Sequence, residues 1–166
     1  MTRVYVGIGS NQRPKQNLRL AIAELAARYR GLEVSPVYRN AAVGFRGDDF
    51  LNMVARFDSG QSPGELLLAF ERIHDLAGRV RGGENMVSRT LDIDLLLYGD
   101  LVQDEPPLPR EDILDYPFVL KPLADLAPKL RHPVTGLTMA QHLASAGCGA
   151  HRLDRVDLNP GSDGAP

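Results

Sequence analysis

Apolar residues follow two different spacings over roughly the first hundred residues of the chain. Segments rich in β-branched and aromatic residues predict strands at 3–9, 32–39, 49–59 and 91–98. Apolar residues that recur every three or four positions predict two helices, from Leu18 to Tyr29 and from Leu66 to Ala77. The predicted order is therefore strand, helix, strand, strand, helix, strand.

Residues typical of helix ends mark the bounds of both predicted helices. Pro14 stands where the first helix is expected to begin, and Gly31 is expected to end it. The pattern Ser62-Pro63-Gly64-Glu65 is a capping box that begins the second helix, which is expected to stop at Gly78. This order predicts a ferredoxin-like α+β fold, with an antiparallel sheet and both helices on one of its faces.

Prolines divide the chain from Pro106 onward into shorter pieces. Short helices are expected near residues 119–126 and 138–146, together with a short strand in the C-terminal part. Residues 154–166 contain few apolar side chains, so we expect a mobile tail there. The pattern contains no internal repeat or boundary, which predicts one domain over residues 1–153.

Composition excludes several classes of protein. Apolar residues make up 43% of the 166 residues and charged residues 24%, which is typical of a soluble globular chain and not of a disordered one. No apolar run approaches the roughly 20 residues that cross a bilayer. Cys148 is the single cysteine, so no internal disulfide can form. We expect a cytoplasmic monomer that does not bind membranes.

The net charge argues against a nucleic-acid partner. Nineteen basic and 21 acidic side chains give a formal charge of −2, whereas proteins that bind nucleic acid through its phosphates are usually strongly basic. Three arginines nevertheless gather in one segment, at Arg79, Arg81 and Arg89, with Glu84 as the opposing charge. A small polyanion fits such a cluster better than a duplex does.

Two aspartates interrupt the apolar strand predicted at 91–98. Side chains alternate along a strand, so Asp92 and Asp94 are expected on one face, with their Cα atoms about 6.5–7 Å apart. Ile93, Leu95 and Leu97 are expected to point the other way, into the core. The aspartate face is therefore the candidate chemical face of this strand.

The paired carboxylates have two interpretations. Burying either ion without compensation would cost several kcal/mol, and a divalent cation such as Mg²⁺ removes that cost by binding carboxylates together with phosphate oxygens. The alternative is a solvated face, with the arginines paired to neighbouring carboxylates. An arginine fork suits phosphate oxygens, and Arg79, Arg81 and Arg89 flank the pair. We therefore favour a site for Mg²⁺ and a polyphosphate.

Other polar residues are less specific. Gly7-Ile8-Gly9-Ser10-Asn11 lacks the lysine and spacing of a P-loop, and we expect a tight turn between strand and helix there. Asn52 interrupts an apolar run, and a buried amide beside Phe50 and Phe118 is suited to the edge of a flat heterocycle. The four histidines show no metal-ligand spacing, so no zinc site is expected.

Several segments match the pattern of a known family. The most specific are 78–81, Gly-Arg-Val-Arg, and 89–99, Arg-Thr-Leu-Asp-Ile-Asp-Leu-Leu-Leu-Tyr-Gly. Supporting segments are 7–11, 37–39, 50–52 and 118–123. Together they resemble the 6-hydroxymethyl-7,8-dihydropterin pyrophosphokinases over about Val4 to Leu126. The resemblance implies transfer of a diphosphate from ATP to a pterin alcohol in tetrahydrofolate biosynthesis.

The resemblance also implies roles for individual residues. Two Mg²⁺ ions would be held by Asp92 and Asp94, and the catalytic arginines would be Arg79, Arg81 and Arg89. The nucleotide side would include Arg81, Arg89, Leu95, Arg110 and His74. The pterin side would include Ala41, Val43, Gly44, Phe50, Asn52 and Phe118. Phe50 takes the place of a tyrosine that is familiar there and keeps the ring.

The chain departs from the family pattern mainly on the nucleotide side. His74 replaces a common glutamate, Met86 a loop tryptophan, Arg110 a histidine, and Tyr116 a frequent arginine. These changes leave a second interpretation, a pterin-binding paralogue that has lost transfer. A third is a phosphotransferase of the same fold that acts on another heterocyclic alcohol. The retained carboxylate pair favours the enzyme.

Overall fold

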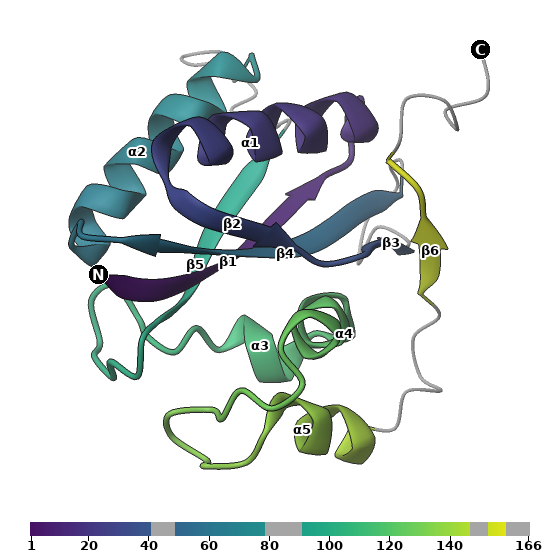
Figure 1. Ribbon diagram of the computed structural model, residues 1–166. Coiled ribbons are helices and arrows are strands. Elements are labelled where there is room, and N and C mark those ends of the chain that lie inside the picture. Colours follow the sequence, from purple (N-terminus) through teal and green to yellow (C-terminus); the bar gives the residue numbers. More distant parts are fainter. Residues whose placement is uncertain (41–48, 79–90, 147–152, 159–166) are drawn as a thin grey trace.

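A single sheet lies between two groups of helices in the computed structural model (Figure 1), which describes residues 1–40, 49–78, 91–146 and 153–158. The strands are β1 (Thr2–Ser10), β2 (Arg30–Val34), β3 (Val37–Asn40), β4 (Phe50–Ser59), β5 (Asp92–Tyr98) and β6 (Asp154–Val156). The helices are α1 (Pro14–Arg28), α2 (Pro63–Leu76), α3 (Asp112–Asp115), α4 (Pro117–Leu126) and α5 (Met139–Ser145).

The sheet has the order β5-β1-β4-β3-β6, and β2 also pairs with β4. The described strand pairs are antiparallel. Helices α1 and α2 cover one face, and α3, α4 and α5 lie on the other (Figure 1). The predicted ferredoxin-like α+β arrangement is confirmed, with an additional helical layer on the face that α1 and α2 leave open.

Two hydrophobic clusters fill the spaces on either side of the sheet. Beneath α1 and α2, Leu18 and Phe70 pack against strand residues such as Phe57. On the opposite face, Leu123 of α4 and Met139 of α5 form a smaller cluster with residues of β1, β4 and β5. The sheet is therefore buried on both faces over much of its area, and the described residues include no helix long and apolar enough to cross a membrane.

The second predicted strand, 32–39, is divided into β2 and β3. Pro36 has no N–H with which to continue a ladder, and the chain leaves regular pairing at Ser35. There the hydroxyl of Ser35 accepts the N–H of Val54 at 2.8 Å, while the N–H of Ser35 donates to the Val54 carbonyl at 2.8 Å. Both strands thus pair with β4, and the side chain of Ser35, which lies between them in the chain, hydrogen-bonds to β4 as well.

Helix α1 ends at Arg28, so the expectation that Gly31 ends it is wrong. Tyr29 is already extended, and its ring stacks on Phe57 with centroids 4.2 Å apart. Gly31 instead has a φ of +69° within β2. The second helix behaves as expected: Ser62 and Glu65 form the capping box, and Gly78 follows the end of α2 with a φ of +85°.

One expected side-chain direction in β5 is wrong. Leu95 pairs with Val6 but Leu97 pairs with Tyr5, which leaves Leu96 as an extra residue in the strand. This bulge turns Leu97 into the cluster beneath α4, while Leu95 stays beneath α1 and α2. The aspartates precede the bulge and keep their common face.

The C-terminal part holds one helix that the pattern did not predict, α3, and the short strand that it did predict, β6. Helix α3 is one turn long, too short for a periodic pattern. Strand β6 begins the range where we expected a mobile tail, and it pairs with β3 through Val37 and Val156. Val156 and Leu158 pack against the larger cluster, which supplies the apolar contact that holds residues 154–158 on the sheet. A mobile tail was expected from residue 154 onward, whereas residues 154–158 are held against the sheet.

Candidate active site

The floor of the candidate site is a stretch of β1 in which the residues that face the site are glycines. Gly7 and Gly9 lie on one face of β1, which runs between β4 and β5. Gly9 pairs with Asn52 on one side and with Asp92 on the other. A Cβ at residue 9 would lie 2.6 Å from Oδ1 of Asn52. Gly7 and Gly9 thus lie in β1, as the strand predicted at 3–9 requires, and the turn expected over 7–11 begins only after Ser10.

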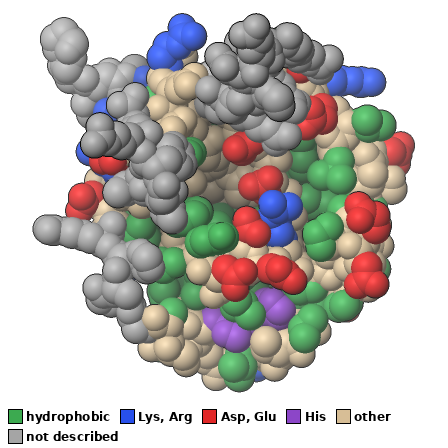
Figure 2. Space-filling model, turned by 180° about the vertical axis from the view of Figure 1, so that it is seen from behind, with side chains coloured by type: hydrophobic (Ala, Val, Ile, Leu, Met, Phe, Trp, Pro, Cys, Tyr) green, Lys and Arg blue, Asp and Glu red, His purple; other side chains and the backbone are tan. Residues whose placement is uncertain are grey.

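A pocket of about 190 Å³ lies over this floor, between the sheet and the layer of α3 and α4. Its lining includes Gly7, Gly9, Asn40, Phe50, Asn52, Asp92, Asp94, Asp112 and Phe118. On the face seen in Figure 2, acidic side chains gather beside a hollow with a basic side chain among them. The predicted metal and pterin residues that the structure describes therefore meet in one pocket.

An amide pair forms one side of the pocket. The amide nitrogen of Asn52 donates a hydrogen bond to Oδ1 of Asn40, at the end of β3. Asn40 is buried and was not among the residues expected from the sequence. In the sequence Asn40 is only a polar residue at the end of a predicted strand. Its place beside Asn52 follows from the pairing of β3 with β4.

Aromatic rings stand at the same end of the pocket as the amides. Phe118, at the start of α4, stacks on Tyr116 with ring centroids 4.9 Å apart and an interplanar angle of 20°. Helix α4 is joined to β3 because the hydroxyl of Tyr38 hydrogen-bonds to Asp125, which also pairs with Lys121 at 3.0 Å. The position of Phe118 over the sheet is thus fixed by contacts outside the pocket.

Asp92 and Asp94 form the opposite side of the pocket. Burial raises the pKa of Asp94 above its ordinary value; Arg110 opposes this shift, and the charges of Asp92 and Asp112 add to it. The side chain of Asp94 is still 40% exposed. A carboxylate in such surroundings gains from a nearby cation.

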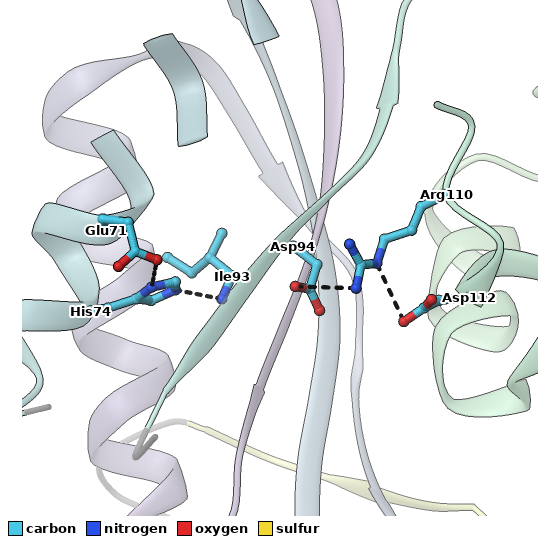
Figure 3. A network of polar contacts seen from close by, with 6 residues as sticks. All are labelled: Glu71, His74, Ile93, Asp94, Arg110 and Asp112. Carbon is cyan, nitrogen blue, oxygen red and sulfur yellow. Dashed lines mark hydrogen bonds and ion pairs between the residues drawn. The ribbon is translucent and has the colours of Figure 1, made fainter. Parts of the chain in front are cut away.

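Arg110 supplies positive charge beside Asp94 (Figure 3). Its Nη2 lies 3.8 Å from Oδ1 of Asp94, and its Nε lies 3.3 Å from Oδ2 of Asp112. The backbone N–H of Arg110 donates to the carbonyl of Leu96 at 3.0 Å, which anchors this segment to β5. Asp112 was not predicted from the sequence; a carboxylate two residues after Arg110 was the available signal.

His74 lies on the other side of β5 and does not line the pocket (Figure 3). The N–H of Ile93 donates to Nε2 of His74 at 2.8 Å, and Nδ1 faces Oε1 of Glu71 at 3.1 Å. The imidazole is 3% exposed and both of its nitrogens have partners. In this structure the ring contacts the strand that carries the aspartates, and its contact with the nucleotide stays a prediction.

Leu95 can approach a nucleotide only through its backbone. Its side chain is 3% exposed and belongs to the cluster beneath α1 and α2. The remaining predicted residues, Arg79, Arg81, Arg89, Ala41, Val43 and Gly44, lie outside the described residues, as does the departure at Met86.

The described carboxylates fit a cation that takes few protein ligands. In residues 1–40, 49–78, 91–146 and 153–158 no group of three or more metal-ligating side chains is close enough to hold an ion alone. Mg²⁺ is usually held by one or two carboxylates together with substrate phosphates. Asp92 and Asp94, on one face of one strand and partly buried, fit that donor set.

The sequence profile of one protein family, "7,8-dihydro-6-hydroxymethylpterin-pyrophosphokinase (HPPK)", matches residues 5–128. The chain belongs to this family. The resemblance stated from the motifs is thus confirmed, and with it pyrophosphate transfer as the activity class.

Similar proteins carry the corresponding enzyme name. A 2-amino-4-hydroxy-6-hydroxymethyldihydropteridine pyrophosphokinase of Synechocystis is 40% identical over 151 residues, which cover 87% of this chain and 76% of that protein. One of Pseudomonas aeruginosa is 40% identical over 137 residues, covering 79% and 84%. The folic acid synthesis protein fol1 of Pneumocystis carinii is 31% identical over 84% of this chain, which spans 19% of that longer protein.

Solved structures share the fold. The Plasmodium falciparum HPPK-DHPS wild type with pteroate superposes with a TM-score of 0.71 at 11% identity. The match covers 87% of this chain and 42% of that one, so this chain spans less than half of the longer protein. At this identity the match supports the fold alone.

Proposed function

We propose that this chain transfers the diphosphate of ATP to 6-hydroxymethyl-7,8-dihydropterin with the help of Mg²⁺ bound at Asp92 and Asp94. The observation that carries the proposal is a single pocket with an acidic pair on β5 at one side and an amide with aromatic rings at the other. The glycine floor of β1 joins the two sides, so two substrates can meet there.

The pterin would bind at the side of Asn52, Phe50 and Phe118. A flat bicyclic ring gains from stacking on aromatic side chains, and its polar edge needs donors and acceptors in a buried place. Asn52 is held by Asn40 and so presents its amide in a fixed orientation. We propose that Ala41, Val43 and Gly44 complete this side.

The phosphates would lie at the side of Asp92 and Asp94. Two Mg²⁺ ions, when bound there, would neutralise phosphate oxygens and charge that develops on them. We propose that Arg79, Arg81 and Arg89 also contact the phosphates, since an arginine fork matches their geometry. Arg110, already beside Asp94, would add a further guanidinium on this side.

Transfer would proceed by one in-line displacement. The hydroxymethyl oxygen of the pterin forms a bond to the β-phosphorus of ATP, and its proton is released. The bond between that phosphorus and the α–β bridging oxygen breaks, and AMP leaves with the electron pair. Catalysis would depend on positioning and charge stabilisation, because phosphoryl transfer needs little else from the protein.

The test is formation of AMP from ATP, Mg²⁺ and the hydroxymethyl pterin. We expect Asp94→Asn to lower the rate of AMP formation by at least about 1000-fold, a loss in the range found when transition-state charge is left unstabilised. Asp58→Asn is the matched control, since Asp58 pairs with Arg3 on the surface. Unchanged turnover in Asp94→Asn would refute the metal assignment.

The same assay separates the other interpretations. Tight pterin binding with no AMP would indicate the binding paralogue, which the departures at His74, Arg110 and Tyr116 would then explain. Absence of both would indicate another heterocyclic alcohol as substrate. A single domain over 1–153, a monomeric state, a cytoplasmic location and the absence of a nucleic-acid partner stay predictions.

A further inference from the structure

We propose that His74 is a positioning residue: it holds the free edge of β5 so that Asp92 and Asp94 keep the geometry that binds the metal–nucleotide complex. This inference rests on the proposed function, because it concerns the same two carboxylates. It assigns His74 a role different from the direct nucleotide contact that the resemblance implied.

The need for such a residue comes from the place of β5 in the sheet. Among the described strands, β5 lies at the edge of the sheet and pairs with β1. The backbone groups of an antiparallel strand alternate between its two sides, so every second residue of an edge strand directs its N–H and C=O away from the sheet. Ile93 directs its N–H this way, and the acceptor is Nε2 of His74, 2.8 Å away.

The arrangement selects one tautomer of His74. Because Nε2 accepts the N–H of Ile93, the proton of the neutral ring is on Nδ1. Nδ1 faces Oε1 of Glu71 at 3.1 Å, one turn earlier on α2 (Figure 3). Glu71 thus orients the ring, and burial of the ring at 3% exposure keeps it from turning to solvent.

The hydrogen bond acts at the residue between the two carboxylates. Asp92 and Asp94 are paired with Gly9 and Gly7 of β1, and Ile93 lies between them with its side chain in the core. His74 adds a contact on the opposite edge, so this strand segment is held from both sides. Two like charges on one face repel, and a rigid backbone would hold both carboxylates in place to bind a cation.

The chain offers a matched control in His132. This second buried histidine also accepts backbone hydrogen bonds, from the N–H groups of Val134 and Thr135 at 3.2 Å each, and it does not line the active-site pocket. His132→Phe therefore removes the same kind of interaction from the fold without touching β5.

The experiment compares His74→Phe, His74→Gln and His132→Phe in the full chain. Binding of Mg²⁺ with a non-hydrolysable ATP analogue is measured by calorimetry, and amide hydrogen exchange of Ile93 by NMR. We expect the affinity of His74→Phe for the complex to fall by about 10-fold or more, as for other residues that orient metal ligands, and its Ile93 amide to exchange faster.

Glutamine keeps an acceptor at similar reach, so His74→Gln should restore affinity to within about threefold of wild type. His132→Phe should lose thermal stability and keep its affinity.

Pterin binding supplies a further readout. Asn52 lies on β4, which His74 does not hold, so His74→Phe should leave the affinity for the pterin unchanged. Wild-type affinity of His74→Phe for the metal–nucleotide complex would overturn the proposal, and so would an equal loss in His74→Gln. If His74→Phe does not fold, Glu71→Ala takes its place, since Glu71 is at the surface; there we expect a weaker loss of affinity and again unchanged pterin binding. Failure of the proposed function is recognised separately, by metal–nucleotide binding that is insensitive to Asp94→Asn.

Discussion

Gly9 illustrates how much of this site depends on a missing side chain. Gly7 and Gly9 lie two positions apart in the strand predicted at 3–9, and glycine within a strand often marks a close approach of backbone or ligand. Here the hydrogen atom of Gly9 faces the amide of Asn52, which has no room for a methyl group. The contact joins residues 43 positions apart in the sequence, so it is invisible until β1 pairs with β4.

Gly9→Ala should therefore weaken pterin binding by about 10-fold, the effect of losing roughly 1.4 kcal/mol, because Asn52 has to move from its place beside Asn40. Calorimetric titration with the pterin measures this. Gly60→Ala is the control, since a Cβ there meets nothing within 4 Å. Equal affinity of the Gly9→Ala variant and wild type would show that Asn52 does not bind the pterin.

The segment between α4 and α5 is an element whose stability depends on one buried imidazole. His132 accepts two backbone N–H groups, and burial, followed by the nearby His142, lowers its pKa below the ordinary 6.5. The folded state therefore binds this proton less readily than the unfolded state does. The stabilising contribution is complete above pH 6.5 and is lost as the pH falls from there through the lowered pKa.

His132→Asn should remove this dependence, because asparagine keeps an acceptor but does not titrate. We expect the free energy of unfolding of the wild type to decrease more steeply between pH 7 and pH 5 than that of the variant. The difference in slope should be at most about 1.4 kcal/mol per pH unit, the limit for one proton. Urea denaturation at several pH values measures both slopes, and parallel curves would contradict the assignment.

The strands of the sheet also show where sequence patterns fail to predict side-chain direction and strand pairing. The alternation in β5 placed Asp92 and Asp94 correctly, because a period of two holds over a few residues of regular strand. It misplaced Leu97, because the bulge at Leu96 depends on the register with β1. The break between β2 and β3 is visible locally, because Pro36 cannot continue a ladder. The hydrogen bond of Ser35 to Val54 of β4 depends instead on how distant segments pair.

At the scale of the whole molecule, one sheet shares its residues between two hydrophobic clusters. β1 contributes Val6 to one cluster and Tyr5 to the other. Neither helical layer can separate without exposing a face of the same strands. We therefore expect the described layers to unfold in one cooperative transition.

Leu66→Ala in α2 and Leu123→Ala in α4 test this coupling from opposite faces. Both side chains are fully buried, so each change should cost about 2–5 kcal/mol. Each variant should lower the midpoint of the same single transition, with far-UV and near-UV circular dichroism in coincidence. Two separated transitions in the Leu123→Ala variant would show that the layer of α3, α4 and α5 is an independent unit.

The amino-acid sequence by itself determined the order of the main strands and helices, the capping box of α2, the common face of Asp92 and Asp94, and the family. These follow from local spacing and from motifs within a few residues of one another. Only the tertiary structure decided that Gly9 makes room for Asn52, that Arg110 reaches Asp94, and that His74 serves the backbone of β5. Such contacts arise between segments distant in the chain, where register, bulges and burial select which polar groups become partners.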